Sequence, residues 1–275
     1  MDTVIVIGVG SDIGRELAVR FAADGWAVKG THRSAAGLRG LPASVQSVLC
    51  DLASRQSIAA AEQWLLTNCR GWRTLIVAAG TEEPIGPFWD CEPDEWDRGI
   101  EVNALAPLRL LRSIYALRDR EAAPSVAFFS GSGTNNAAPA YSAYAASKIM
   151  LIKMCELLDA ESPDTSFFII GPGIVRTKIH EETLKAKSRA GANHQRVVDF
   201  LGSSEVGTSH DDIYACMRWC MSADKKTIGG RNISLVHDAW RQGQARLLEQ
   251  WLAADPDRYK LRRFGNGHRI GSGQQ

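Results

Sequence analysis

The chain has 275 residues, of which 45% are hydrophobic and 23% charged, a composition typical of a folded globular protein with an ample core. Its 32 basic and 31 acidic residues nearly cancel, so no overall charge favours nucleic acid or an anionic membrane as a partner. No stretch approaches the roughly 18 apolar residues of a membrane span, and the N-terminus has no signal-peptide pattern, so we expect a cytoplasmic protein. The six cysteines stand singly in apolar surroundings, which predicts buried free thiols and no metal site.

Short apolar runs recur along the chain, separated by segments with helical periodicity. The runs predict seven strands, at residues 4–8, 27–31, 47–50, 74–78, 126–130, 167–170 and 232–236. Helices are expected at residues 15–23, 54–69, 94–118, 141–161 and 211–221. Near-continuous apolar strands that alternate with helices indicate a parallel sheet covered on both faces. Residues 1–240 are therefore predicted to form a single doubly wound Rossmann-type α/β domain.

Two segments do not fit this alternation. Residues 178–207 are polar and follow the sixth strand, where the carboxyl ends of strands line a ligand crevice, so we expect a mobile flap over substrate. Its basic side chains suit either an anionic substrate or a solvated helix face: Lys178, His180, Lys185, Lys187 and Arg189. Residues 241–275 are expected to form a C-terminal extension.

A glycine-rich loop, Gly8-Val9-Gly10-Ser11-Asp12-Ile13-Gly14, joins the first strand to the first helix. At this place the pyrophosphate of a dinucleotide meets backbone N–H groups and the positive end of a helix dipole. Glycine is needed because a β-carbon would block the close approach of the phosphate. The spacing is not G-x-G-x-x-G, so the position directly after the first strand supports the prediction more than the pattern does.

The second strand ends at Thr31-His32-Arg33-Ser34, where a nucleotide-binding fold contacts the adenosine ribose. An acidic residue here would bind a 2′-hydroxyl, whereas a cation accommodates a 2′-phosphate. The segment has no acid, so His32, Arg33 and Ser34 favour NADP(H), with NAD(H) still possible. Asp51, which follows the third strand, is placed to bind the adenine edge, or alternatively to cap the helix that begins near Ser54.

Tyr144 and Lys148 are one helical turn apart and share a helix face. A free phenol titrates near 10 and is a poor acid or base at neutral pH. A unit charge about 4 Å away is worth about 4 kcal/mol at an effective dielectric of about 20, enough to lower the phenol pKa by up to about three units. Lys148 is therefore predicted to turn Tyr144 into a general acid and base for an alcohol or ketone.

With these motifs, residues 4 to about 240 resemble the short-chain dehydrogenase/reductase family. Gly8, Ile13 and Gly14 match the glycine loop of that family, while Asp12 stands where many members have the middle glycine. The Asp51-Leu52 pair also matches. The family's Asn-Asn-Ala-Gly strand end is Val77-Ala78-Ala79-Gly80 here, so Ala79 and Gly80 are retained as cofactor neighbours and both asparagines are lost.

The resemblance also implies catalytic roles around Tyr144. Asn103 corresponds to the asparagine that holds a water in a proton relay to the lysine, unless it only back-bonds to its own helix. The family's serine usually lies thirteen residues before the tyrosine, and Gly131 occupies that position. A contraction of the loop would place Ser132 at the site, and an expansion would place Ser130 there. We prefer Ser132, because Ser130 more naturally ends the strand.

Pro172-Gly173-Ile174-Val175-Arg176-Thr177 resembles the family's Pro-Gly-x-x-x-Thr segment, which implies that Pro172 and Gly173 border the cofactor and that Val175 and Thr177 meet the nicotinamide carboxamide. The resemblance implies an NADPH-dependent reductase of a small-molecule ketone, reversible toward the alcohol. It also implies a homodimer or homotetramer. Two alternatives are a non-catalytic NADP(H)-binding sensor or scaffold and a nucleotide-sugar epimerase or dehydratase.

Overall fold

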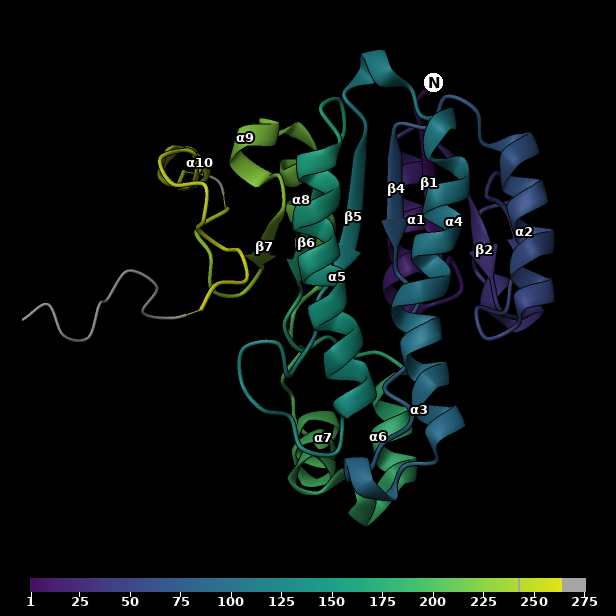
Figure 1. Cartoon of the computed structure of the whole chain (residues 1–275), viewed down its shortest axis with the longest axis vertical. Coiled ribbons are helices and arrows are strands. Elements are labelled where there is room, and N and C mark those ends of the chain that lie inside the picture. The colour runs from purple at the N-terminus through teal and green to yellow at the C-terminus, as the bar shows by residue number, and fades with distance from the viewer. Residues whose placement is uncertain (242, 264–275) are drawn as a thin grey trace, which may run out of the picture.

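The computed structural model describes residues 1–241 and 243–263, which fold around one parallel sheet (Figure 1). Its seven strands lie in the order β3-β2-β1-β4-β5-β6-β7. This order confirms the predicted α/β fold of Rossmann type. The strands are β1 (Thr3–Ile7), β2 (Ala27–His32), β3 (Gln46–Leu49), β4 (Thr74–Val77), β5 (Ser125–Phe129), β6 (Ser166–Gly171) and β7 (Arg231–Ser234). The strand order reverses between β1 and β4, and ligands of open α/β sheets bind outside the carboxyl ends of strands at such a point.

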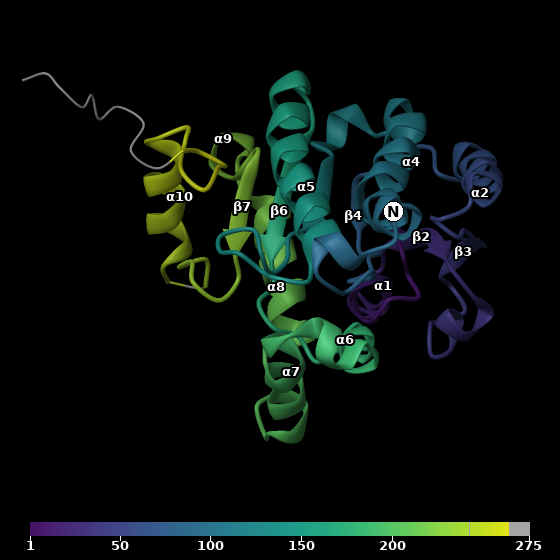
Figure 2. The ribbon, with the colours of Figure 1, turned by 60° about the horizontal axis from the view of Figure 1, so that its bottom comes forward.

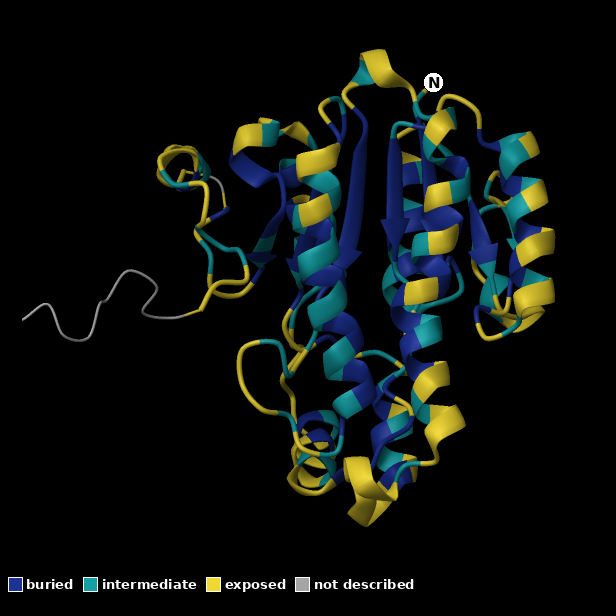
Figure 3. Cartoon of the chain, in the orientation of Figure 1, coloured by how far each residue is buried: buried dark blue, intermediate teal, exposed yellow. Residues whose placement is uncertain are grey.

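Helices cover both faces of the sheet (Figures 1 and 2). Leu17 and Phe21 on one face and Leu110 and Leu151 on the other pack against strands that are almost wholly buried (Figure 3). The helices are α1 (Asp12–Ala23), α2 (Arg55–Asn68), α3 (Pro93–Ile100), α4 (Ala106–Ile114), α5 (Ser142–Glu161), α6 (His180–Ala186), α7 (Ala192–Gly202), α8 (His210–Ser222), α9 (Lys225–Ile228) and α10 (Ala245–Ala253). In the described residues, no helix is long and apolar enough to cross a membrane. All six cysteines are free, and every one except Cys91 is buried.

The helix predicted at residues 94–118 is not continuous. Between α3 and α4 the backbone adopts a π-helical segment, Glu101–Leu105, and α4 is followed by a 3₁₀ turn, Tyr115–Leu117. Asn103 lies within the π-helical segment, and its side chain bonds to the backbone of Thr81 rather than to its own helix. A π-bulge of this kind often occurs at a functional site because it changes the direction of a side chain.

The C-terminal extension packs against the last strand. Leu248 and Leu252 of α10 are buried in the core, and the Asn232 N–H of β7 donates to the carbonyl of Tyr259 at 2.8 Å. The extension therefore covers the edge of β7, whose backbone groups would otherwise be open to pairing with another chain. Residues 264–275 of the predicted extension lie outside the described residues.

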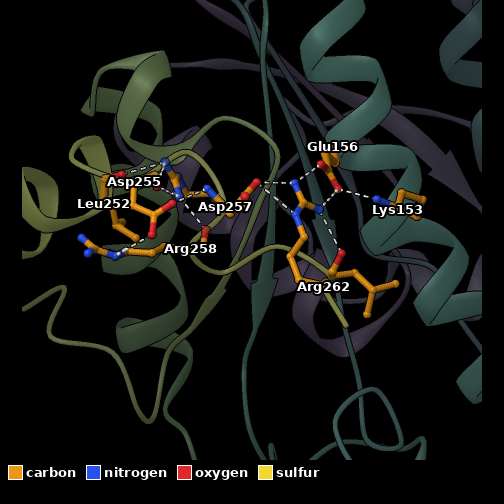
Figure 4. Close-up of polar contacts among 9 residues, drawn as sticks. Lys153, Glu156, Leu252, Asp255, Asp257, Arg258 and Arg262 are labelled. Atoms are coloured by element: carbon orange, nitrogen blue, oxygen red, sulfur yellow. Dashed lines mark hydrogen bonds and ion pairs between the residues drawn. The ribbon is translucent and has the colours of Figure 1, made fainter. Parts of the chain in front are cut away.

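Two arginines, Arg231 and Arg262, hold the extension in place, and Figure 4 labels Arg262 with its partners Glu156 and Asp257. The guanidinium of Arg231, which is only 2% exposed, donates to the carbonyls of Leu252 at 2.8 Å and of Asp255 at 3.2 Å. Farther along the chain, Arg262 binds Glu156 of α5 at 2.6 Å, so the segment after α10 returns to the body of the domain. A buried cation at the carboxyl end of α10 also complements the dipole of that helix.

Candidate active site

The predicted site residues lie at the carboxyl edge of the sheet, on the connections that follow β1 to β6, in the π-helical segment of Asn103 and on the first turns of α5. The strands point toward α6 and α7, which form much of the end of the molecule beyond this edge (Figure 1). Both helices lie within the predicted flap, residues 178–207. The loops that follow β1, β4, β5 and β6 thus meet the flap at one place.

Tyr144 and Lys148 lie together on the buried side of α5. Tyr144 is 8% exposed, and its hydroxyl has no hydrogen-bond partner among the described residues. Lys148 is buried, with its Nζ 5.5 Å from the centroid of the Tyr144 ring. The ammonium group donates to the carbonyl of Phe129, at the end of β5, at 3.0 Å. The phenol is therefore the free polar group of the pair.

The predicted lowering of the Tyr144 pKa is wrong in this structure. Burial raises that pKa, and the nearby carboxylates of Glu82 and Glu182 raise it further. The Lys148 ammonium cannot reverse the effect because it is directed to the Phe129 carbonyl, and burial lowers its own pKa to about 8. Tyr144 thus holds its proton at neutral pH in the free protein.

Neither candidate serine contacts Tyr144. The Ser130 hydroxyl donates to Asn232 Oδ1 at 3.1 Å and so points toward β7, whereas Ser132 is exposed. Gly131, at the position of the family's serine, lies directly against the phenol, and a β-carbon there would overlap the Tyr144 hydroxyl oxygen. The missing side chain at residue 131 is what gives Tyr144 its present position.

Replacing Gly131 by alanine should therefore lower kcat by roughly tenfold or more, because the new methyl group displaces the phenol from its place. Steady-state kinetics with a responsive carbonyl substrate measures this, with thermal unfolding as a check on folding. Gly202→Ala is the matched control, since a β-carbon on Gly202 meets no atom within 4 Å. Unchanged kcat in Gly131→Ala would show that the position of Tyr144 does not depend on this contact.

Asn103 is fully buried beside Lys148. Its Oδ1 accepts from the Thr81 N–H at 2.8 Å, and its Nδ2 donates to the Thr81 carbonyl at 2.9 Å. A β-carbon on Gly80 would lie 3.3 Å from Asn103 Oδ1 and 3.9 Å from Lys148 Nζ. Gly80 therefore borders the space that Asn103 and Lys148 share.

A hydrogen-bonded acidic cluster, which was not predicted from the sequence, lies between the loop after β4 and α6. The buried Glu82 carboxylate accepts from the Thr183 hydroxyl at 2.8 Å, and the Thr183 hydroxyl lies 2.7 Å from that of Tyr141. Burial raises the pKa of Glu82 to about 7. Glu182 accepts from the Thr81 hydroxyl at 3.0 Å and from the Glu82 N–H at 2.6 Å, and burial raises its pKa too. Polar residues directly after a buried strand were the available signal in the sequence.

The glycine-rich loop fits a dinucleotide pyrophosphate. A β-carbon on Gly8 would lie 2.7 Å from the Ala79 nitrogen, and one on Gly14 would overlap the Gly8 carbonyl oxygen. Ser11 caps α1 by accepting from the Gly14 N–H at 3.1 Å. The N–H groups of Asp12 and Ile13 have no acceptor in the described part of the chain, so they are free to bind an anion at the helix end.

The side chain of Asp12 is directed away from this helix end. Its carboxylate accepts from the Lys178 N–H at 2.6 Å, and the Lys178 ammonium lies 3.6 Å from it. Gly10 touches Gly37 in the turn after β2, where a β-carbon on Gly10 would lie 3.1 Å from the Gly37 Cα. The glycine loop is thus joined to the flap on one side and to the nucleotide-ribose region on the other.

The residues expected near the adenosine lie at the ends of β2 and β3. His32 bonds through Nδ1 to the Ser47 hydroxyl at 3.0 Å, while Arg33 and Ser34 are exposed just beyond it. Asp51 is exposed, and its carboxylate accepts from the Ala53 N–H at 3.0 Å. The alternative role of Asp51 as a helix cap is wrong, because Ser54 caps α2. Leu52 is buried.

The segment after β6 leads from the sheet into the flap. Pro172 is buried, and Gly173 has φ +74°, with a would-be β-carbon 2.5 Å from the Val236 side chain. Val175 is buried and pairs with Gly207 in an isolated bridge. The Thr177 hydroxyl donates to the Val175 carbonyl at 3.4 Å, just before α6 begins. The His180 ring nitrogen lies 2.9 Å from the same carbonyl.

Residues 2–188 match the family model of the short chain dehydrogenases. The chain belongs to the short-chain dehydrogenase family. Members are NAD(P)-dependent dehydrogenases and reductases that act on small molecules, which agrees with the glycine loop and the Tyr144 and Lys148 pair. The family resemblance predicted from the motifs is thereby confirmed.

Several known proteins that are similar to this short-chain dehydrogenase are distant from it in sequence. An uncharacterized oxidoreductase of Schizosaccharomyces pombe is 27% identical over 105 residues, which span 38% of this chain and 42% of that relative. A short-chain dehydrogenase/reductase structure from Saccharomyces cerevisiae superposes with TM-score 0.74 at 19% identity, covering 87% of this chain and 98% of the other.

Two similar structures contain a nicotinamide cofactor. A Shigella flexneri family member complexed with NADP gives TM-score 0.69 at 22% identity, covering 85% of this chain and 96% of the other. A Brucella melitensis 3-ketoacyl-(acyl-carrier-protein) reductase complexed with NADH gives 0.70 at 18%, also covering 85% and 96%. These likenesses support the fold, and they include both cofactors.

Proposed function

We propose that this protein is an NADPH-dependent reductase of a small carbonyl compound, with Tyr144 as the proton donor. The observation that carries the proposal is the Tyr144 hydroxyl, which has no hydrogen-bond partner among the described residues, beside a buried Lys148 at the carboxyl edge of the sheet. A ligand can use a hydroxyl that the described residues leave without a partner. The free N–H groups at the start of α1 lie at the same edge.

A bound nicotinamide would supply the hydride for a carbonyl carbon. The residues of the chain then handle the proton. Tyr144 keeps its proton at neutral pH because its pKa is raised, so it is in the form that donates to a carbonyl oxygen. The Lys148 ammonium stabilises the tyrosinate that remains, and Asn103 lies close enough to help return a proton from the Lys148 side.

Ser132 is the better candidate to hold the carbonyl oxygen. The Ser130 hydroxyl is already used by Asn232, whereas Ser132 is exposed on the loop next to Gly131. On the cofactor side, we assign the carboxamide contact to the backbone of Val175 and the hydroxyl of Thr177. The flap at residues 178–207, a homodimer or homotetramer and a cytoplasmic location stay predictions.

Arg33 supports the choice of NADPH. Its side chain is exposed at the end of β2, where a 2′-phosphate would lie, and no acidic residue takes its place. Arg33→Ala should raise the KM for NADPH by roughly tenfold and leave the KM for NADH within about twofold, because only NADPH carries the 2′-phosphate. Arg39→Ala, another exposed arginine in the same connection, is the matched control. An unchanged ratio of NADPH to NADH kinetics would remove Arg33 from this role.

The proposal is tested by following NADPH oxidation with a panel of ketones and aldehydes and confirming the alcohol product by mass spectrometry. We expect at least one carbonyl compound to be reduced, with NADPH preferred over NADH. NADPH binding without turnover of any carbonyl compound would instead favour a non-catalytic NADP(H)-binding protein.

A further inference from the structure

The charged groups of the chain that act on the Tyr144 phenol from the flap side are negative. Glu82 follows β4 and Glu182 begins α6, and both carboxylates raise the pKa of Tyr144. Among the described residues, neither has a basic side chain within ion-pair distance. Two carboxyl groups that have no basic partner in the described residues therefore lie on the flap side of the phenol.

The basic residues of the flap do not offset this charge. Lys178 pairs with Asp12, 3.6 Å away, and Lys185 pairs with Glu181 at 3.9 Å on the outside of α6. Lys187 and Arg189 are exposed. For the lysines and Arg189, the structure favours the solvated face over an anionic substrate, whereas His180 is buried with a ring nitrogen 2.9 Å from the Val175 carbonyl.

The two acids differ in whether a carboxylate oxygen remains without a hydrogen-bond donor. Glu182 is committed to the loop after β4, since it accepts from the Thr81 hydroxyl and the Glu82 N–H. Glu82 accepts from Thr183 through Oε2 only, so its Oε1 has no donor in the described part of the chain. Glu82 is 9% exposed, and the nearby Tyr144 hydroxyl also has no partner. Each of these two mostly buried residues thus has a polar atom without a hydrogen-bond partner in the described part of the chain.

A carboxylate buried without a cation is costly, and it can be neutralised either by a proton or by a cationic ligand. In the free protein a proton neutralises the Glu82 carboxylate, because burial raises the pKa of Glu82 to about 7. The titratable neighbours are Glu182 on α6, Glu83 on the same loop, and Tyr141 and Tyr144 on α5. None of these neighbours is a cation, and the buried Lys148 ammonium of α5 is directed to the Phe129 carbonyl, so a positive charge on the ligand would be the first directed to Glu82.

We propose that the substrate is a carbonyl compound that carries a positively charged nitrogen, and that Glu82 binds this nitrogen while Tyr144 faces the carbonyl oxygen. The inference rests on the proposed reductase function and names its substrate class. Glu182 acts as a positioning residue, which holds Glu82 through its backbone N–H. The charge on Glu82 selects for cations and against anions.

Two ketones of the same shape test the proposal: N,N-dimethyl-4-oxopiperidinium, whose charge is permanent, and its uncharged isostere 4,4-dimethylcyclohexanone. At about pH 8.5, where Glu82 is ionised, kcat/KM for the charged ketone should exceed that for the neutral one by roughly tenfold or more. At about pH 5.5, below the Glu82 pKa of about 7, the ratio should fall toward one. The probe itself does not titrate, so the change reports the protein.

Glu82→Gln keeps a group that can bond to Thr183 but has no charge, so the ratio should be close to one at both pH values. Glu181→Gln removes a charge from the outside of α6 and should leave the ratio as in the wild type. Should Glu82→Gln fail to fold, the wild-type ratio at about pH 8.5 still decides. Equal kcat/KM for the two ketones at about pH 8.5 in the wild type would overturn the proposal.

Binding separates this proposal from the reductase function. Titration calorimetry on the cofactor-free protein, which has no hydride to transfer, should show that the charged ketone binds wild type roughly tenfold more tightly than Glu82→Gln. If neither ketone is reduced but this difference is found, the cation site stands and the proposed reaction does not. Equal affinity of wild type for the charged and neutral ketones overturns the cation site, whatever the activity.

Discussion

Replacing Tyr144 by phenylalanine should lower kcat for carbonyl reduction by roughly a thousandfold, while the Kd for NADPH stays within about twofold. The phenyl ring fills the same space beside Gly131, so only the hydroxyl that donates the proton is lost. Stopped-flow or steady-state NADPH oxidation measures the rate, and fluorescence titration measures cofactor affinity. The loss should appear in kcat, because the hydroxyl contributes most where the proton is transferred.

Tyr115→Phe is the matched control for this experiment. Tyr115 is partly buried, but its hydroxyl donates to the Thr165 hydroxyl at 3.1 Å, away from the site. We expect wild-type kcat from it, with at most a small loss of stability. A Tyr144→Phe enzyme that kept more than about a tenth of the wild-type kcat would exclude Tyr144 as the proton donor.

Replacing Lys148 by methionine should lower kcat by roughly a hundredfold or more. Methionine fills the buried space, but the charge that stabilises the tyrosinate is lost, and the Phe129 carbonyl loses its donor. Because burial lowers the pKa of Lys148 to about 8, wild-type activity should also decline as the pH rises through about 8 and the ammonium loses its proton. The pH profile of kcat measures this decline.

The variant Lys148→Arg tests whether the loss of the charge on residue 148 causes the alkaline decline. Arginine keeps its charge at alkaline pH, so any residual activity of this variant should no longer fall near pH 8. Lys153→Met, on the exposed side of the same helix and paired with Glu156 at 2.7 Å, should behave as the wild type. An alkaline decline that persisted in Lys148→Arg would assign the titration to another group.

The fold could be predicted from the sequence because its signals are local and repeated. The strand Thr3–Ile7 reads as five apolar or β-branched residues because both faces of a central parallel strand are covered. The glycine loop was likewise readable, since Gly8 and Gly14 are required by close backbone contacts directly after that strand. In the same way, the spacing of Tyr144 and Lys148 on one helix fixed their common face.

The electrostatics of the site could not be predicted in this way. The pKa of Tyr144 depends on how deeply it is buried and on Glu82 and Glu182, which are 62 and 38 residues away in the chain and reach it only through the fold. The direction of the Lys148 ammonium is set by the Phe129 carbonyl, which carries no side-chain signal. The spacing correctly placed the two side chains on one helix face but gave the wrong direction for the Tyr144 pKa.

Two local features of the structure, the π-helical segment around Asn103 and the contact of Gly131 with Tyr144, could not be predicted from the sequence for similar reasons. The π-helical segment around Asn103 shows no break in the helical periodicity, because its cause is the backbone of Thr81, which Asn103 binds from a distant part of the chain. The sequence shows that Gly131 replaces the family's serine, but it does not show how this exchange affects the position of Tyr144. Only the structure places the phenol where a side chain at residue 131 would be.

The most direct measurement of the central claim is the transfer of deuterium from NADPH that is doubly deuterated at C4. With a responsive ketone, we expect one deuterium at the carbinol carbon of each alcohol formed, detected by mass spectrometry or NMR. The Tyr144→Phe variant should form no labelled alcohol beyond its residual turnover. An alcohol without deuterium, or labelled alcohol formed equally fast by wild type and Tyr144→Phe, would contradict it.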